Sequence, residues 1–361
     1  MRLHVFAGCL SLILLVSAAL ATTTLNVSSS GNVTTLTGRW FDYVVVIMLE
    51  NHSINDTYGV SNPFWNNTST TCLGNCDYLT SLANQNGLAE SYTNTGVAGG
   101  SQGDYIAITS GYGNSNCNGA AVPSCWLDIP NIVDSLETAH LTWKAYMEGY
   151  PTSSGCANDF TGPPNNYGPN HNPFVYYSDI QNNTARCSRI VNANSQVANQ
   201  TRASDKSVCW PSPVDNDDLF LNDLNSVTDA SNYMFLTPNT ADDFHDCNDV
   251  SLGNAWMQNM IPQILGSTLF SAKRAALFIT FDEPDCTFKV TGSPNNCPPH
   301  ARQLYTVWAS NPTTPTTRLL FKSVNTYTHY SALRTIEDNW GLPPLVPAND
   351  GSANNMQEFL L

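Results

Sequence analysis

The sequence predicts a three-layer α/β/α sandwich built on a mostly parallel central sheet. Val44 to Leu49 is an unbroken apolar run rich in β-branched residues, which is typical of a strand buried on both faces of a parallel sheet. A second apolar run extends from Arg274 to Phe281. Segments with strand character alternate with helix-like segments along the chain, and this alternation places helices on both faces of the sheet.

The remaining elements follow in order from local patterns. Besides the strand near 42–49, runs of apolar residues predict strands near 89–93, 141–147, 232–236, 276–281 and 304–309. Helical spacing of apolar residues predicts helices within 72–87 and over 131–139, 216–224, 254–270 and 328–340, and a glycine-rich loop opens another at about 101. We expect Pro262 to kink or break the helix over 254–270, because proline removes a backbone donor.

The domain organisation is set by the N-terminal region. Arg2 precedes an apolar stretch from Leu10 to Val16, and small residues end at Ala21, so residues 1–21 are expected to be a signal peptide of a secreted protein. Residues 22–38 form a flexible Ser/Thr-rich lead-in, and 39–361 a single domain with a loop-rich insertion at about 150–211. No later segment has ~18 uninterrupted apolar residues, so we expect no stable membrane insertion.

Cysteines and sequons agree with export. Ten cysteines follow the signal segment, and an even number in an exported chain favours disulfides. Three pairs lie in loops and are candidates for local bridges, although connectivity stays open: Cys72/Cys76, Cys117/Cys125 and Cys286/Cys297. Seven Asn-X-Ser/Thr triplets, headed by residues 26, 32, 55, 66, 67, 182 and 199, predict a glycoprotein. Asn51 also heads such a triplet, but we expect it to be unmodified because it follows a buried strand directly.

The charge balance limits the partners. The net charge is −15, from 14 basic and 29 acidic residues, and the pI is about 4.6. A surface that binds a polyanion is therefore not expected, which argues against nucleic acid as a partner. The low density of charge also favours a protein that works in acid.

Both apolar strands end on pairs of oxygen donors. Glu50 and Asn51 follow the first strand directly, and Asp282 and Glu283 follow the late one. Because functional sites in open α/β sheets lie beyond the carboxyl ends of the strands, we expect these four side chains to lie close together. They offer hard oxygen ligands and no thiolate, which suits a divalent cation that polarises a phosphoryl oxygen.

A serine and three histidines complete the candidate set. Ser101 stands at the expected start of a helix, where the dipole and free amides favour an alkoxide or a bound anion; the alternative is a simple N-cap. Residues 239–246 are dense in ligands and acid–base groups. His171, His245 and His329 each lie in a turn or at a helix start, and three such histidines in one chain favour a functional role.

Six blocks in this order resemble the phosphoesterase family of bacterial phospholipases C and acid phosphatases, which belongs to the alkaline-phosphatase-like superfamily. They are Leu49–Ser53, Ser101–Gly111, His171–Phe174, Thr237–Asn239 with Asp243–Asp246, Phe281–Glu283, and His329–Ser331 through Asp338. The resemblance implies an alkaline-phosphatase-like fold and a metal-dependent phosphoester hydrolase whose substrate is a small phosphate ester.

The resemblance also implies roles for individual residues. The divalent metal cation would be held by Glu50, Asn51, Ser101, Asp282 and Glu283. Ser101 would be the nucleophile and become transiently phosphorylated. His171, His245 and His329 would be catalytic and line the phosphate, with Asn51 and Asp246 as further substrate-binding residues.

One block departs from the family pattern. Members commonly carry His-Pro-Ser-X-Pro-Asn-Tyr around the nucleophile, whereas this chain carries Gly-Gly-Ser-Gln-Gly-Asp-Tyr at 99–105, with Asp104 in place of asparagine. Three hypotheses follow: an acid phosphatase that hydrolyses monoesters through a phosphoserine, a phospholipase C-type phosphodiesterase, or an inactive secreted glycoprotein that keeps the fold. The short C-terminus after the His329 helix favours the first.

Overall fold

The computed structural model describes residues 36–60, 72, 74–97, 99–113, 125–157, 167–194, 217–245, 250–284 and 302–361. The expected signal peptide, residues 22–35 of the lead-in, the sequons at 26, 32, 66, 67 and 199, and the cysteine pair Cys286/Cys297 lie outside these residues, as do Cys117 and Asp246. Among the described helices, none combines the length and the apolar character needed to cross a bilayer.

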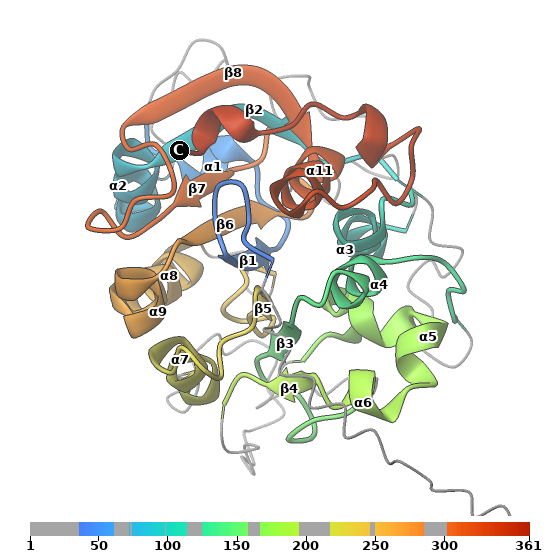
Figure 1. Cartoon of the computed structure of the whole chain (residues 1–361). Coiled ribbons are helices and arrows are strands. Elements are labelled where there is room, and N and C mark those ends of the chain that lie inside the picture. The colour runs from blue at the N-terminus through green and yellow to red at the C-terminus, as the bar shows by residue number, and fades with distance from the viewer. Residues whose placement is uncertain are drawn as a thin grey trace, which may run out of the picture. The chain divides into compact units, whose positions relative to one another are not determined.

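The unit from Thr35 to Leu361 is built around an eight-stranded sheet with the strand order β4-β3-β5-β1-β6-β7-β2-β8 (Figure 1). The strands are β1 (Tyr43–Leu49), β2 (Gly87–Thr93), β3 (Trp143–Met147), β4 (Ile190–Asn192), β5 (Tyr233–Thr237), β6 (Ala275–Phe281), β7 (Val307–Ala309) and β8 (Phe321–Thr328). Only β7 runs antiparallel to its neighbours β6 and β2. The predicted, mostly parallel sheet is confirmed.

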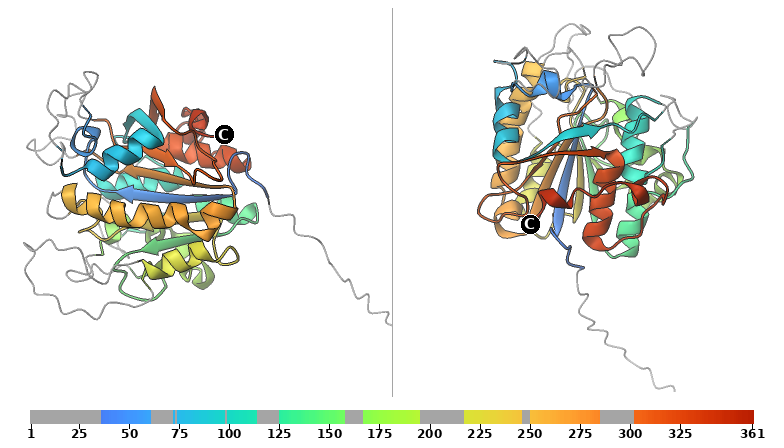
Figure 2. Two further views of the ribbon diagram at one scale, coloured as in Figure 1. Left: turned by 90° about the vertical axis from the view of Figure 1, so that its left-hand side faces the viewer. Right: turned by 90° about the horizontal axis from the view of Figure 1, so that it is seen from above.

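Helices cover both faces of the sheet, as the right-hand view of Figure 2 shows. One layer holds α2 (Asp77–Gln85), α7 (Asp218–Asn225), α8 (Val250–Gly266) and α9 (Thr268–Ala272). The other holds α3 (Ser101–Ser110), α4 (Ile132–Thr138) and α11 (His329–Trp340). The predicted three-layer α/β/α sandwich is therefore present.

Short helices join these layers to the loops. They are α1 (Ile54–Thr57), α5 (Ser178–Gln181), α6 (Thr184–Cys187) and the 3₁₀ turns η2 (Pro169–His171), η3 (Pro173–Tyr176), η5 (Asp350–Ser352) and η6 (Gln357–Phe359). The described part of the segment expected to be loop-rich thus contains two 3₁₀ turns, two short helices and the edge strand β4. The Cys156–Cys187 disulfide ties this segment together, and the predicted Cys72–Cys76 bridge is also formed.

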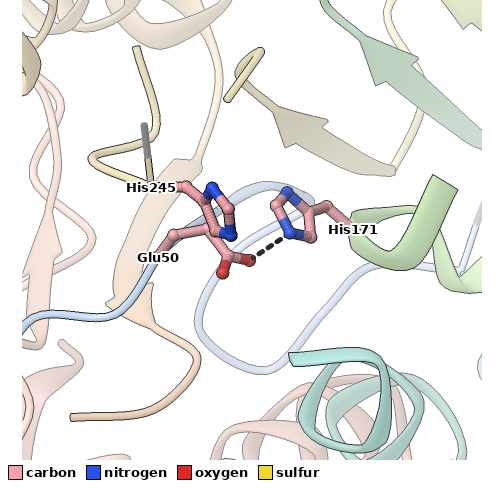
Figure 3. Close-up of side chains that lie close together, drawn as sticks. All are labelled: Glu50, His171 and His245. Carbon is pink, nitrogen blue, oxygen red and sulfur yellow. Dashed lines mark ion pairs between the residues drawn. The ribbon is translucent and has the colours of Figure 1, made fainter. Parts of the chain in front are cut away.

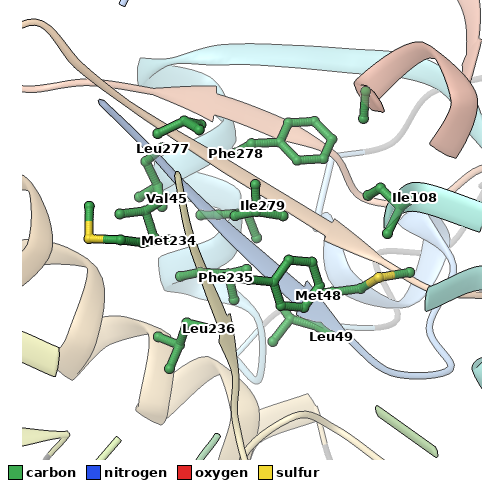
Figure 4. Packing of buried hydrophobic residues seen from close by; sticks show 14 of the residues in the cluster. Val45, Met48, Leu49, Ile108, Met234, Phe235, Leu236, Leu277, Phe278 and Ile279 are labelled. Atoms are coloured by element: carbon green, nitrogen blue, oxygen red, sulfur yellow. The ribbon is translucent and has the colours of Figure 1, made fainter. Parts of the chain in front are cut away.

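The core lies on both sides of the central strands (Figure 4). Every residue of β6 is buried, and so is β1 from Val44 to Leu49, which is why these strands read as continuous apolar runs. No comparable apolar run predicts the two edge strands, β4 and β8. Only Ser323 and Tyr327 of β8 are buried, because an edge strand can keep polar side chains in water.

The expected break at Pro262 is wrong. Helix α8 continues through Pro262 to Gly266, and the interruption comes at Ser267, which caps α9 through a hydrogen bond from the Phe270 amide to its hydroxyl. Pro262 lies on the exposed side of the helix, while Met257 and Ile261 are buried against the sheet. Packing of that buried side keeps the helix in place despite the lost backbone bond.

Candidate active site

The two carboxylate-bearing strand ends meet at the centre of the sheet. β1 lies between β5 and β6, and Leu49 is paired with Phe281 in the register of β1 and β6. The Asp282 amide donates to the Leu49 carbonyl at 2.8 Å, and the Asn51 amide donates to Asp282 Oδ1 at 2.8 Å. Asn51 leaves the strand with a φ of 57°, in the left-handed region that asparagine tolerates. This turn brings Glu50, Asn51 and Asp282 together, as the sequence predicts.

Three oxygen atoms at this point are buried and have no hydrogen-bond partner among the described residues: Glu50 Oε1, Asn51 Oδ1 and Asp282 Oδ2. Burial, followed by the charges of Asp282 and Asp243, raises the pKa of Glu50 well above its usual value. Burial, followed by the charges of Asp282 and Asp104, raises the pKa of Glu283 to about 9. Buried oxygens that repel one another and lack donors fit a bound cation, so the residues present are compatible with the metal that the resemblance implies.

The Ser101 hydroxyl points into the same site. It donates to Glu50 Oε2 at 2.9 Å, and the Asn51 side-chain amide donates to that same oxygen at 3.1 Å. The simple N-cap interpretation of Ser101 is wrong: the N-cap of α3 is Gly100, and Ser101 is the first residue of the helix. Gly100 has a φ of 59°, a conformation that disfavours any side chain, and so the glycine-rich loop is what aims Ser101 at Glu50.

His171 lies on the other side of Glu50 and is held by three contacts. Its Nε2 lies 3.3 Å from Glu50 Oε1, and its Nδ1 lies 3.0 Å from Asp243 Oδ2. The ring of Tyr105 stacks on the imidazole with a centroid distance of 5.6 Å and an interplanar angle of 9°. The structure therefore places His171 in the site, fixed on a 3₁₀ turn between a carboxylate and an aromatic ring.

His245 reaches the site from the loop after β5. Its amide donates to Asp243 Oδ1 at 2.9 Å, and its ring centroid lies 5.4 Å from that of His171. The intervening Phe244 has a φ of 80°, which is strained for a bulky residue and turns the His245 side chain toward the strand ends. Figure 3 shows Glu50, His171 and His245 converging from three segments. One ligand atom from each lies within 4.8 Å of the others.

His329 is placed differently from the other two histidines. Its Nε2 lies 2.7 Å from the backbone carbonyl of Asp282, and its Nδ1 lies 3.0 Å from the Tyr92 hydroxyl. Since a carbonyl only accepts, Nε2 carries the proton and Nδ1 accepts from Tyr92. Burial lowers the pKa of His329 to about 4, although its contacts with Asp282 oppose this. The imidazole is thus buried and engaged at both nitrogens.

Asp104 and Asp243 are site residues that sequence reasoning did not assign. Asp104 Oδ1 lies 3.7 Å from His329 Nε2, and burial, followed by the charge of Asp282, raises the pKa of Asp104 to about 8. Burial also raises the pKa of Asp243, against the opposing effect of His171. Both residues lie inside the motif blocks. The neighbouring sequence does not indicate that either carboxylate contacts a histidine that is distant in the chain.

Comparison with known proteins now identifies the family. The model of the Phosphoesterase family matches residues 73–343, well over half of the chain. The chain belongs to the phosphoesterase family. This confirms the resemblance drawn from the motif blocks.

Relatives of this phosphoesterase-family chain include fungal proteins. A phosphate-repressible acid phosphatase of Penicillium chrysogenum is 28% identical over 257 residues, which cover 68% of this chain and 50% of the relative. An acid phosphatase of Aspergillus niger is 26% identical over 243 residues, which cover 67% of this chain and 48% of the relative. The chain thus spans about half the length of these relatives.

Solved structures show the same fold. A protein in the alkaline phosphatase superfamily from Vibrio parahaemolyticus has a TM-score of 0.54 at 11% identity, covering 85% of this chain and 68% of that one. The C-terminal periplasmic domain of EcEptC from Escherichia coli, in complex with Zn, has a TM-score of 0.50 at 11% identity, covering 86% of both chains. The predicted alkaline-phosphatase-like fold is confirmed at this level.

Proposed function

We propose that this protein is a secreted, metal-dependent acid phosphatase that hydrolyses phosphate monoesters through a phosphoserine on Ser101. The hydrogen bond from the Ser101 hydroxyl to Glu50 Oε2 at 2.9 Å carries the proposal. It aims a nucleophile at a buried carboxylate, in the direction in which the hydroxyl proton has to leave. The names of the fungal relatives support a phosphatase working in acid, and the N-terminal sequence supports export.

The cation would be held by a set of oxygen ligands: Glu50, Asn51, Ser101, Asp282 and Glu283. When bound, a divalent cation supplies Lewis-acid polarisation of the phosphoryl group and favours ionisation of a nearby hydroxyl. Asn51 Oδ1 and Asp282 Oδ2 are buried and have no hydrogen-bond partner among the described residues. This supports the ligand set, because burying an oxygen without a donor or a cation costs free energy.

The side chains suggest a two-step transfer. Ser101 Oγ attacks phosphorus, its proton passes to Glu50, and the bond from phosphorus to the alcohol oxygen breaks. His171 and His245 line the opposite wall, where they stabilise the phosphoryl oxygens, and one of them protonates the departing alcohol. Asn51 and Asp246 are proposed to bind the substrate. Water then attacks the phosphoserine, which releases phosphate and restores the hydroxyl.

His329 takes a positioning role in this scheme. Its Nε2 donates to the Asp282 carbonyl, so it holds the strand end that carries two of the proposed ligands. Both nitrogens are engaged within the protein, and we therefore propose that His329 acts through Asp282 instead of touching the phosphate.

A substrate panel with matched variants tests the proposal. The chain is assayed on p-nitrophenyl phosphate, bis(p-nitrophenyl) phosphate and phosphatidylcholine from pH 4 to 8, before and after chelation and re-addition of Mg²⁺, Mn²⁺ or Zn²⁺. We expect turnover of the monoester in acid and a loss of at least about 10³-fold in kcat for Ser101→Ala. Ser110→Ala is the control, because its hydroxyl donates to the Ile106 carbonyl and accepts from the Tyr112 amide at the other end of α3.

The outcomes separate the alternatives. Preferential turnover of the diester or the lipid would replace the monoesterase with a phospholipase C-type enzyme. Full activity of Ser101→Ala would exclude Ser101 as the nucleophile. No turnover with any of the three ions would favour the inactive glycoprotein.

A further inference from the structure

We infer that Glu148 is a positioning residue, which holds the loop after β5 so that His171 and His245 can act on the phosphoryl group. The inference rests on the proposed function, because that function gives the two histidines their role. It goes further by assigning a residue that lies outside every motif block and acts through another residue, Asn239.

Glu148 lies beside the start of this loop. It follows β3 directly, and Met147 is paired with Thr237, the last residue of β5. The Glu148 amide donates to the Thr237 carbonyl at 3.0 Å. Glu148 is only 1% exposed, so its carboxylate lies inside the protein, at the point where the chain leaves β5 for residues 238–245.

The carboxylate of Glu148 joins the loop to helix α8. Its Oε2 accepts from the Asn239 backbone amide at 2.8 Å and from the Asn239 side-chain amide at 3.1 Å. Its Oε1 accepts from the indole nitrogen of Trp256, in α8, at 2.8 Å. A buried carboxylate costs free energy unless donors satisfy it, and hydrogen bonds to a carboxylate are stronger than those between neutral groups. These contacts therefore hold Asn239 in one place.

Asn239 passes this constraint on to the rest of the turn. Its side-chain oxygen accepts from the Ala241 amide at 2.9 Å, and its side-chain amide also donates to Asp242 Oδ2 at 2.8 Å. Its backbone carbonyl accepts from the amides of Asp242 and Asp243, each at 2.9 Å. Because residues 239–244 are all buried as well, a displacement of Asn239 displaces the whole turn.

Asp243 links the turn to both histidines. Its Oδ2 lies 3.0 Å from His171 Nδ1, and its Oδ1 accepts from the His245 amide at 2.9 Å. Its carbonyl accepts from the Glu50 amide at 2.8 Å. Hydrogen bonds thus connect the Glu148 carboxylate to both histidines shown in Figure 3. A shift of about 1 Å in such an arrangement can lower a rate by about 10²-fold.

Helix α8 supports the same loop at a second point. Gly253 lies against the ring of Phe244, and a Cβ atom at Gly253 would come within 2.3 Å of that ring. Gly253 and Trp256 are three residues apart, so they lie on the same side of the helix. The loop is therefore fixed between the end of β3, through Glu148, and one side of α8.

The competing explanation is that Glu148 only stabilises the fold. In that case its replacement lowers the turnover of every substrate by the same factor. A positioning role acts selectively, because one of the histidines protonates the departing alcohol. An alkyl phosphate needs this proton, whereas p-nitrophenolate is a stable anion that leaves without it. The ratio of the two kcat values therefore separates the explanations.

The test compares Glu148→Gln with the wild type on glycerol 2-phosphate and on p-nitrophenyl phosphate. We expect kcat to fall about 10- to 100-fold for the alkyl ester and no more than about threefold for the aryl ester. Asp223→Asn is the matched control. Asp223 is also a buried carboxylate, but it accepts from the Tyr146 hydroxyl of β3 at 2.6 Å. Its replacement should change both kcat values by the same factor.

A second variant keeps the inference testable if Glu148→Gln fails to fold. Glu148→Asp retains the carboxylate but withdraws it from Asn239 by one methylene group. We expect the kcat ratio of the two esters to change in the same direction. A ratio that stays at the wild-type value in the variant that folds overturns the positioning role, and so does an equal loss on both esters.

A measurement without catalysis separates this inference from the proposed function. A wild type that hydrolyses neither ester would reject the proposed function. The imidazole ¹⁵N signals of His171 and His245, assigned by their loss in His171→Gln and His245→Gln, then decide the inference. Glu148→Gln should shift both signals, and Asp223→Asn should shift neither. Signals that stay in place in Glu148→Gln would show that Glu148 does not position the histidines.

Discussion

Replacing Glu337 should flatten the pH dependence of stability. Glu337 and Asp350 are fully buried carboxyl groups in direct contact, remote from the proposed ligands. Glu337 Oε1 accepts the Leu345 amide at 3.0 Å, and Asp350 Oδ1 accepts the Val346 amide at 2.9 Å. Burial, followed by the charge of Asp350, raises the pKa of Glu337 to about 9.

The sign of the effect follows from proton binding. Between its usual pKa of 4.5 and about 9, Glu337 holds a proton in the folded chain that it has lost in the unfolded chain. The free energy of unfolding therefore falls as pH rises, by up to about 1.4 kcal/mol per pH unit. Between pH 5 and 8 the upper limit is about 4 kcal/mol, and solvent relaxation around the ionised pair reduces the expected loss to about 2 kcal/mol.

Glu337→Gln tests this directly. The glutamine retains an acceptor for the Leu345 amide and a donor toward Asp350, but it does not titrate. We expect it to be close to neutral at pH 5 and about 2 kcal/mol more stable than the wild type at pH 8. Urea unfolding at pH 5, 6.5 and 8 measures the difference.

Glu358→Gln is the control for this experiment. Burial alone would raise the pKa of Glu358, but hydrogen bonds from Ser323, Tyr327 and Asn325 lower it below its usual value. Glu358 is thus ionised throughout this range, and the effect of its replacement should not vary from pH 5 to 8. A difference between wild type and Glu337→Gln that is equally flat would refute the reasoning.

Three further predictions concern the site. Gly100→Ala should destabilise the fold by about 1–3 kcal/mol and lower kcat, because a side chain at a φ of 59° shifts Ser101. Gly266→Ala is the control and should do neither, because the space around Gly266 is open. Thermal unfolding measures the stability of both variants, and a phosphatase assay measures their kcat. Tyr92→Phe should cost about 1–3 kcal/mol in urea unfolding, since it leaves the buried His329 Nδ1 without its donor; an unchanged midpoint would contradict that assignment. Chelation should lower the Tm, and added Zn²⁺ should raise it again in proportion to ln[Zn²⁺], because the cation offsets repulsion among buried carboxylates. A Tm that does not change with the metal concentration would reject a buried cation.

The amino-acid sequence was enough to predict the central strands and the pairs of oxygen donors that follow them. β1 and β6 are central strands buried on both faces, so each had to be a continuous apolar run, and the oxygen pairs that follow them necessarily lie at one edge of a parallel sheet. The order of six motif blocks then sufficed to indicate the family. The edge strand β8 was not predicted, because most of its residues face water and leave no apolar pattern in the sequence.

The different environments of the three histidines depend on contacts that form only in the folded chain. In the sequence, His171, His245 and His329 look alike, each beside turn or cap residues. In the fold, Asp243 turns His171 toward Glu50, while Tyr92 and the Asp282 carbonyl occupy both nitrogens of His329. The role of an imidazole depends on what its two nitrogens contact, and those contacts come from residues that are distant in sequence.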